Sequence, residues 1–208
     1  MSIITVTGIG TDVGKTVVSA VLAEALGADY WKPVQWGTGA ITDRETIKGL
    51  VSHPNVQVHP EAYSFDIAQA PHHISPLTGQ ELDPNKISLP ITDRPLIIES
   101  TGGILVPFRR SLLMLDVLTK WESHWVIVSK NYLGSINHTL MTVEVLRQRQ
   151  VPIWGIIFNG PEDPASENFI LNYTGLSCLA RLHVEPQIDP NTVKKYATLW
   201  KEKLKHKM

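Results

Sequence analysis

Continuous apolar runs alternate along this chain with apolar residues at helical spacing. Five runs of the kind found in buried strands begin with the β-branched stretch at Ile3 and continue at 29–33, 95–99, 125–129 and 152–159. Their residues are apolar at consecutive positions rather than at every second one, as expected when helices cover both faces of a parallel sheet. The pattern therefore predicts buried, mostly parallel strands.

Helical spacing appears between and after these runs. One stripe follows the first run, and its members are Val17, Val18, Val21, Leu22 and Leu26. A second stripe consists of Ile136, Leu140, Val143 and Leu146. Residues 191–205 predict a terminal helix, and the lysines between Lys194 and Lys207 are expected on its solvated face. Strands alternating with helices in this way predict an open α/β sheet with right-handed crossovers.

A glycine-rich turn that ends in Gly14, Lys15 and Thr16 joins the first strand to the first helix. Backbone N–H groups and the positive end of the helix dipole converge on an anion at such a turn, which predicts a nucleoside triphosphate site. Lys15 is placed to reach the β- and γ-phosphates, and the Thr16 hydroxyl to ligate Mg²⁺. Five residues separate Gly8 from Gly14 instead of the usual four, and an ordinary tight turn is the alternative.

Composition narrows the class of protein. The 208 residues, 43% hydrophobic and 19% charged, fit one globular P-loop NTPase-like domain over 1–208, with helices on both faces of a mostly parallel sheet. A net charge of -1 gives no electrostatic basis for binding nucleic acid or an anionic membrane. No apolar run approaches the ~20 residues of a membrane span, and the chain enters a strand without the basic start of a signal peptide. Cys178 is the single cysteine, so we expect no intrachain disulfide and a cytoplasmic location.

Polar residues at strand ends are the next candidates for the site, because ligands gather at the carboxyl ends of parallel strands. Pro33 interrupts the second strand, so Lys32 is expected near the phosphate loop, unless it is an ordinary surface lysine. Glu99 ends a strand that faces this loop and predicts a second Mg²⁺ anchor, with capping of a turn as the alternative. Asn159 also lies at a strand end, and the structural alternative for Asp43 is to cap a helix.

Two further regions leave their interpretation open. The segment 52–90 is rich in proline and histidine with little periodicity, which indicates either a functional loop or hidden helices. The adjacent pair His72 and His73 cannot share one helical face as a zinc pair would. Ser135, at the start of the long helix, is expected either to cap it or to help bind a carboxylate there.

Several of these motifs, taken in order, resemble the dethiobiotin synthetase family. The family's phosphate loop reads Gly-Thr-Asp-Thr-Glu-Val-Gly-Lys-Thr, and here it is Gly8-Ile9-Gly10-Thr11-Asp12-Val13-Gly14-Lys15-Thr16, with the same five-residue spacing. Similar blocks stand at Lys32-Pro33-Val34, Thr42-Asp43, Pro71-His72-His73-Ile74-Ser75, Glu99-Ser100-Thr101-Gly102-Gly103 and Leu133-Gly134-Ser135-Ile136-Asn137-His138. The correspondence extends in order from residue 3 to about 190.

The resemblance implies an ATP- and Mg²⁺-dependent cyclo-ligase. In that family CO₂ and 7,8-diaminononanoate form a carbamate, ATP converts the carbamate to a carbamic-phosphoric anhydride, and ring closure gives dethiobiotin for biotin synthesis. By carry-over, the catalytic residues are Thr11, Lys15 and Lys32. The implied nucleotide-binding residues are Asp12, Val13, Gly14, Lys15, Thr16, Val17 and Asn159, and the implied metal ligands are Thr16, Asp43 and Glu99. The implied substrate-binding residues are Thr11, Lys32, Gly102, Gly134, Ser135, Ile136 and Asn137, the last four acting across a homodimer interface.

The chain departs from the family pattern at several positions, and one other class of protein has the same fold. Asp12 replaces a glutamate, Trp36 stands where a small serine is common, and residues 181–183 replace Glu-Ile-Pro near the adenine end. The rival is a regulatory or partitioning-type P-loop ATPase of the same fold, without ligase activity. Those ATPases carry a second lysine early in the phosphate loop, and Thr7, Gly8 and Ile9 supply none.

Overall fold

Six parallel strands form the central sheet of the protein, which is a computed structural model describing residues 2–37, 41–65 and 82–205. The spatial order of the strands is β10-β9-β8-β1-β5-β2. Their bounds are Ile3–Gly8 for β1, Asp29–Trp31 for β2, Leu96–Glu99 for β5, His124–Lys130 for β8, Ile153–Asn159 for β9 and Cys178–Leu182 for β10. β1 pairs in parallel with β5 on one side and with β8 on the other, so the phosphate loop leaves the middle of the sheet.

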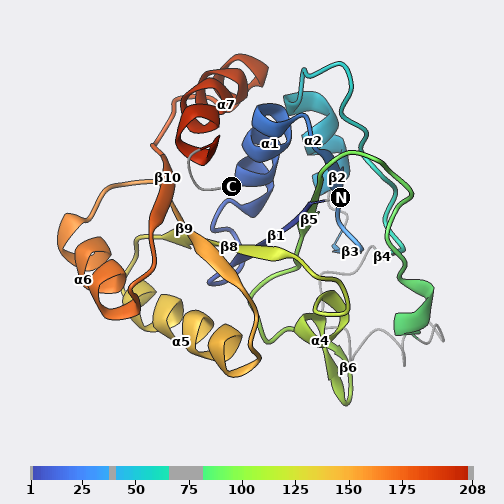
Figure 1. Cartoon of the computed structure of the whole chain (residues 1–208), viewed down its shortest axis with the longest axis horizontal. Coiled ribbons are helices and arrows are strands. Elements are labelled where there is room, and N and C mark those ends of the chain that lie inside the picture. The colour runs from blue at the N-terminus through green and yellow to red at the C-terminus, as the bar shows by residue number, and fades with distance from the viewer. Residues whose placement is uncertain (1, 38–40, 66–81, 206–208) are drawn as a thin grey trace.

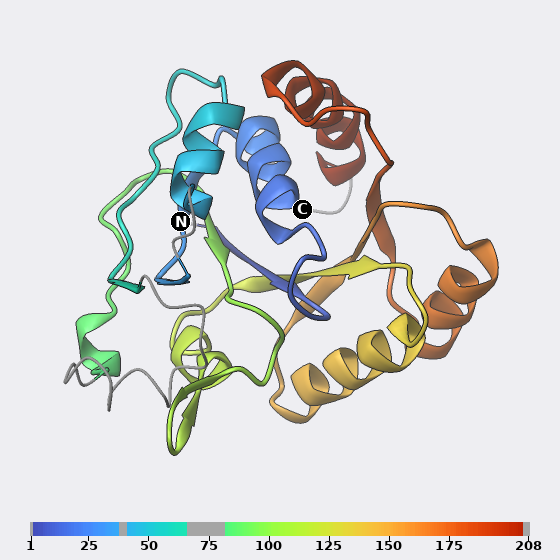
Figure 2. The same cartoon turned by 180° about the vertical axis from the view of Figure 1, so that it is seen from behind.

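Helices cover both faces of this sheet (Figures 1 and 2). One face carries α1 (Lys15–Leu26), α2 (Asp43–Leu50) and α7 (Pro190–Lys205). The other face carries α4 (Met114–Leu118), α5 (Ser135–Gln148) and α6 (Pro164–Thr174). The α/β sheet expected from the apolar runs is therefore confirmed. Among the described helices, none combines the length and the apolar character needed to cross a bilayer.

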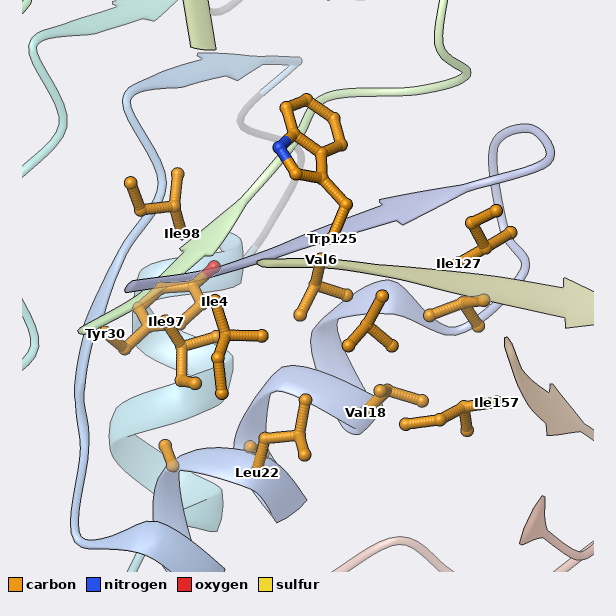
Figure 3. Packing of buried hydrophobic residues seen from close by; sticks show 14 of the residues in the cluster. Ile4, Val6, Val18, Leu22, Tyr30, Ile97, Ile98, Trp125, Ile127 and Ile157 are labelled. Atoms are coloured by element: carbon orange, nitrogen blue, oxygen red, sulfur yellow. The ribbon is translucent and has the colours of Figure 1, made fainter. Parts of the chain in front are cut away.

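The core lies between the sheet and α1 (Figure 3). Ile4, Val6 and Ile97 point from the sheet toward Val18 and Leu22 of the helix, and all five side chains are buried. Fully burying such an aliphatic side chain contributes about 1.5–3 kcal/mol, so this contact fixes the helix that begins at the phosphate loop. Trp125 and Ile98 project to the opposite side of the sheet in the same view.

Two small sheets lie outside the central one. β3 (Val34–Trp36) pairs in parallel with β4 (Tyr63–Phe65), and β6 (Pro107–Arg109) pairs antiparallel with β7 (Leu112–Leu113). The run at 29–33 therefore ends its strand at Trp31, because Pro33 cannot donate to the ladder and the chain passes into a different sheet. In the segment 52–90, β4 and a 3₁₀ turn at Pro84–Lys86 are the ordered elements among the described residues. The His72-His73 pair and the block 71–75 lie outside the described residues.

Two helix starts differ from the sequence expectation. Gly134, in the left-handed region at φ 100, is the N-cap of α5, and Ser135 is its buried first residue rather than its cap. Thr42 caps α2 in a capping box with Glu45, so Asp43 is the first helical residue and its carboxylate is not used as the cap. The solvated lysine face expected for the terminal helix is confirmed for Lys194, Lys195, Lys201 and Lys203 of α7.

Candidate functional site

The phosphate loop turns tightly around two positions that exclude a side chain. A β-carbon on Gly8 would lie 2.6 Å from Val13 Cγ2. Gly14 has φ 90, and a β-carbon there would lie 2.1 Å from Asn159 Nδ2. Asp12 also adopts a positive φ of 56, a conformation that costs a residue with a side chain about 1–2 kcal/mol. The five residues between Gly8 and Gly14 therefore form a compact turn before α1 and not an open loop.

Asn159, at the end of β9, holds this loop from the neighbouring part of the sheet. Its side-chain amide donates a hydrogen bond of 2.8 Å to the carbonyl oxygen of Val13. The sequence placed Asn159 at a strand end beside the phosphate loop, and the structure confirms that position. Its proposed contact with the base of the nucleotide stays a prediction.

Lys15 bends back over the loop that precedes it. Its Nζ donates a hydrogen bond of 2.8 Å to the carbonyl oxygen of Gly10, and the residue is 7% exposed. Burial, opposed in part by the charge of Glu99, lowers the pKa of Lys15 to about 8. Glu99, Asp43 and Asp12 act on this ammonium in the opposite direction to burial.

Lys32 bridges the two carboxylates of the site. Its Nζ donates to Asp43 Oδ2 and, over 3.3 Å, to Glu99 Oε1. Although burial disfavours the charged lysine, Glu99 and Asp43 raise the pKa of Lys32 above its ordinary value. Burial likewise opposes ionisation of Asp43, but the Lys32 ammonium lowers the pKa of that carboxyl. Lys32 thus belongs to the site and is not an ordinary surface lysine.

Thr16 lies against the same two carboxylates. Its Oγ1 is 2.7 Å from Asp43 Oδ1 and 3.0 Å from Glu99 Oε1. A hydroxyl has one hydrogen and can donate it to only one of these oxygens at a time. The three residues therefore place more oxygen acceptors together than their own protons satisfy, which is the chemistry of a site for a hard cation.

Tyr30 is a member of this cluster that the sequence analysis missed. Its phenol donates a hydrogen bond of 2.9 Å to Glu99 Oε2, and the residue is fully buried. The signal was its position two residues before Lys32 on the same strand, because alternate residues of a strand project to the same face. Glu99 is 1% exposed, so the structure assigns it to the site and not to an exposed turn.

A cavity of about 740 Å³ opens beside these groups. The predicted site residues that line it are Thr11, Asp12, Gly14, Lys15, Thr16, Val17, Lys32, Asp43, Glu99 and Gly102. The lining residues absent from the predicted site are Gln35, Trp36, Gly37, Ile41, Thr101, Val106 and Pro107. One end of the cavity is thus ionic, while Trp36, Ile41, Val106 and Pro107 make part of its wall apolar.

Trp36 is held in that wall by aromatic stacking. Its ring lies 4.7 Å from that of Phe65 at an interplanar angle of 11°, and Phe65 in turn stacks on Tyr63. β3, which pairs with β4, contributes Gln35 and Trp36 to the lining of the cavity. Among the described residues, the buried indole nitrogen of Trp36 and the amide oxygen of Gln35 have no hydrogen-bond partner.

The start of α5 does not line this cavity. Gly134, Ser135, Ile136 and Asn137 are outside it, and Ser135 is buried beneath the helix. Leu133, directly before this helix, is fully exposed. The predicted role of residues 134–137 in binding substrate across a dimer interface therefore stays a prediction.

Comparison with known proteins identifies a family model and close relatives that match almost the whole chain. A protein-family model described as an AAA domain matches residues 3–192. The ATP-dependent dethiobiotin synthetase of Chlamydia abortus is 44% identical over 205 residues, which cover 98% of this chain and 97% of that protein. The enzyme of the same name from Cytophaga hutchinsonii is 44% identical over 193 residues, with 92% and 93% of the two chains covered.

Solved structures share the fold at much lower identity. A putative plasmid partition protein of Borrelia burgdorferi bound to AMPPNP superposes with a TM-score of 0.60 at 11% identity, covering 98% of this chain and 97% of that one. The cell division ATPase MinD of Pyrococcus furiosus gives a TM-score of 0.60 at 16% identity, with 99% and 98% covered. At such identities the likeness shows the P-loop NTPase-like fold alone, so it does not favour the rival class of partitioning ATPases.

Proposed function

The chain belongs to the ATP-dependent dethiobiotin synthetase family, which are ligases of biotin biosynthesis, and from this membership we propose that it converts 7,8-diaminononanoate and CO₂ to dethiobiotin. The observation that carries the proposal is the convergence of Lys15, Lys32, Asp43 and Glu99 on one cavity. Phosphoryl transfer needs positioning and neutralisation of charge, and these four side chains supply both.

The proposed reaction has three steps. An amine of the diamine attacks CO₂, forming a C–N bond and releasing a proton, which gives a carbamate. A carbamate oxygen then attacks the γ-phosphorus of ATP, the bond to ADP breaks, and a carbamic-phosphoric anhydride forms. Finally the second amine attacks the carbamate carbon, the C–O bond to phosphate breaks, and a proton leaves with closure of the ring. The products are dethiobiotin, ADP and phosphate.

We assign Lys15 and Lys32 to different anionic groups of this reaction. Lys15 follows the glycine turn directly, so we assign it to the β- and γ-phosphates. Lys32 directly follows β2 and lines the same cavity, and it is assigned, with the Thr11 hydroxyl and the loop at Gly102, to the carbamate. Fixed positive charge at the transferring group is the kind of stabilisation that accounts for much of catalysis in such sites.

The donor set at Thr16, Asp43 and Glu99 fits Mg²⁺. All its atoms are oxygens, two of the three residues are carboxylates, and they lie within hydrogen-bond distance of Thr16 Oγ1. Mg²⁺ prefers oxygen ligands and is held in nucleotide sites by one or two carboxylates together with phosphate oxygens. When bound, the ion supplies neutralisation of phosphate charge.

The nucleotide itself is assigned to the turn and the start of α1. The residues proposed for it are Asp12, Val13, Gly14, Lys15, Thr16, Val17 and Asn159. The free N–H groups at the start of α1 and the positive end of its dipole favour the triphosphate there.

We further propose that the active form is a homodimer in the cytoplasm. The start of α5 lies beside the fully exposed Leu133 and the half-exposed Met141, a surface suited to a second copy of the chain. Gly134, Ser135, Ile136 and Asn137 would then bind the substrate carboxylate of the neighbouring subunit. Cys178 is the single cysteine of the sequence, which fits a reducing compartment.

One assay tests the proposal. Purified protein is mixed with 7,8-diaminononanoate, bicarbonate and Mg²⁺, with ATP or GTP, and dethiobiotin and nucleoside diphosphate are measured together. Formation of dethiobiotin with one ADP per product supports the ligase. Hydrolysis of ATP that does not depend on the diamine, with no dethiobiotin, would instead favour a regulatory ATPase. The exposed-lysine variant Lys48→Ala is the matched control for variants of the site.

A further inference from the structure

Tyr30 contacts the buried carboxylate of the site from beneath. Its phenol oxygen lies 2.9 Å from Glu99 Oε2, while Glu99 Oε1 is 3.0 Å from Thr16 Oγ1 and 3.3 Å from Lys32 Nζ. The two carboxylate oxygens therefore have separate partners. Oε2 points to the core, and Oε1 points to the groups that line the cavity.

Strand geometry explains how this arrangement arises. Tyr30 lies in β2, and Lys32 directly follows that strand two residues later; both side chains reach Glu99. β2 pairs in parallel with β5, with Tyr30 opposite Ile97, and Figure 3 shows both side chains on the face that carries α1. Glu99 follows Ile97 by two residues and lies on that face as well. Tyr30 in β2 and Lys32 directly after it therefore both bind the carboxylate of Glu99 in the neighbouring strand β5.

The phenol is suited to a fixed role. Tyr30 is fully buried, so a rotation of its ring would disturb close-packed neighbours. A phenol carries one O–H donor and an ionised carboxylate only accepts, so the hydrogen bond runs from Tyr30 to Glu99. A hydrogen bond to a charged group is stronger than one between neutral groups, and it holds the carboxylate in one orientation.

We propose that Tyr30 is a positioning residue for the divalent cation: by binding Glu99 Oε2 it fixes the carboxylate so that Oε1 alone faces the metal and the nucleotide. This inference rests on the proposed function only in taking Glu99 as a metal ligand. Hydrogen-bonded partners of metal ligands commonly change metal affinity by about 10- to 100-fold when they are removed.

The test measures metal binding directly. Mn²⁺ serves as the probe, and free Mn²⁺ is followed by electron paramagnetic resonance during titration of the protein saturated with ADP. Tyr30→Phe removes one oxygen and keeps the ring, and we expect it to weaken Mn²⁺ binding about 10-fold or more, with ADP binding in the absence of metal unchanged. The matched control is Tyr196→Phe, which removes a phenol–carboxylate hydrogen bond of 2.6 Å to Glu185, away from the cavity, and should leave Mn²⁺ affinity unchanged.

A double variant separates positioning from general damage to the fold. In a Glu99→Gln background the carboxylate is gone, so adding Tyr30→Phe should weaken Mn²⁺ binding no further. The same loss in that background would overturn the proposal, because Tyr30 would then act by another route. Thermal denaturation of each variant checks that it is folded at the assay temperature before the Mn²⁺ titrations are compared.

The outcomes also separate this inference from the ligase assignment. If the wild-type protein forms dethiobiotin and Tyr30→Phe binds Mn²⁺ as tightly as wild type, the positioning role is wrong and the ligase function stands. If the wild-type protein forms no dethiobiotin but Tyr30→Phe loses Mn²⁺ affinity through Glu99, the ligase assignment is wrong and the positioning role stands.

Discussion

Asn159 donates a hydrogen bond from its side-chain amide to the carbonyl oxygen of Val13, 2.8 Å away, although 146 positions separate the two residues in the sequence. The bond joins the end of β9 to the phosphate loop after β1, two strands away across β8. The loop is therefore held from the sheet as well as from its own helix. Its shape depends on a close approach that leaves no room for a side chain at Gly14.

We predict that Gly14→Ala weakens nucleotide binding and that Gly10→Ala does not. An alanine at position 14 would have to adopt φ 90, and its β-carbon would lie 2.1 Å from Asn159 Nδ2. A β-carbon at Gly10 would meet nothing within 4 Å. The strain costs about 1–3 kcal/mol before the clash is counted, so ATP affinity should fall at least ~10-fold. Calorimetric titration of both variants with ATP checks this, and equal affinities would contradict it.

Lys15→Ala should lower dethiobiotin formation by on the order of 10²-fold or more, because it removes the charge nearest the glycine turn. Lys48→Ala, an exposed lysine of α2, should retain wild-type turnover. Steady-state kinetics of the two variants under saturating substrate are the measurement. Near-normal turnover in Lys15→Ala would remove Lys15 from the catalytic role.

Trp36→Ser should raise the KM for the diamine about 10-fold and change the KM for ATP little, because the apolar wall is lost while the phosphate loop is untouched. Trp36→Phe keeps a ring that can stack on Phe65 and should stay close to wild type. An unchanged KM for the diamine in Trp36→Ser would show that the substrate chain lies elsewhere.

Stability should depend on pH through Asp163, the N-cap of α6. Its carboxylate accepts hydrogen bonds from the Ser166 side chain and main-chain N–H, and the first of these chiefly lowers the pKa of Asp163 below its ordinary value of 3.8. A carboxyl with a lowered folded-state pKa stabilises the fold above its unfolded value, and this contribution is lost as pH falls through the folded value. Asp163→Ala should therefore unfold a few degrees lower than wild type at pH 7, and this difference should shrink below about pH 3.8.

The control for this prediction is Asp163→Asn, since asparagine also caps helices. It should unfold close to wild type at pH 7. Thermal unfolding followed by circular dichroism at pH 7 and at pH 3 gives the comparison. A constant difference between Asp163→Ala and wild type across this range would show that the cap does not act through its charge.

Sequence patterns predicted the central strands because those strands are buried on both faces and are therefore apolar throughout. β10 was missed, since Cys178–Leu182 is short and contains Arg181. α6 was missed for a related reason: its buried residues include Glu167 and Thr174, so no apolar stripe marks it. Arg181 donates a hydrogen bond to Glu167, and such a pairing between a strand and a helix becomes visible only in three dimensions.

The candidate site likewise contains residues that the sequence predicted and residues that it did not. Lys15, Lys32 and Glu99 were predicted from a local motif and from the rule that strand ends gather ligands, whereas Asp43 was predicted only from the family resemblance. The structure brings all four together at one cavity. The apolar wall was not predicted as a whole, because Val106 and Pro107 reach the cavity through packing between segments that are distant in sequence. Tyr30 had a usable signal in its spacing from Lys32, but its contact with Glu99 depends on the register between β2 and β5.

Pro33 separates β2, which belongs to the central sheet, from β3, which pairs with β4 in a small sheet and carries Trp36 in the wall of the cavity. Lys32 and Trp36 are therefore held by two different sheets although they are four positions apart. Under the proposed function, we expect substitutions around Trp36 to alter the choice of diamine more readily than they alter the phosphate chemistry at Lys32.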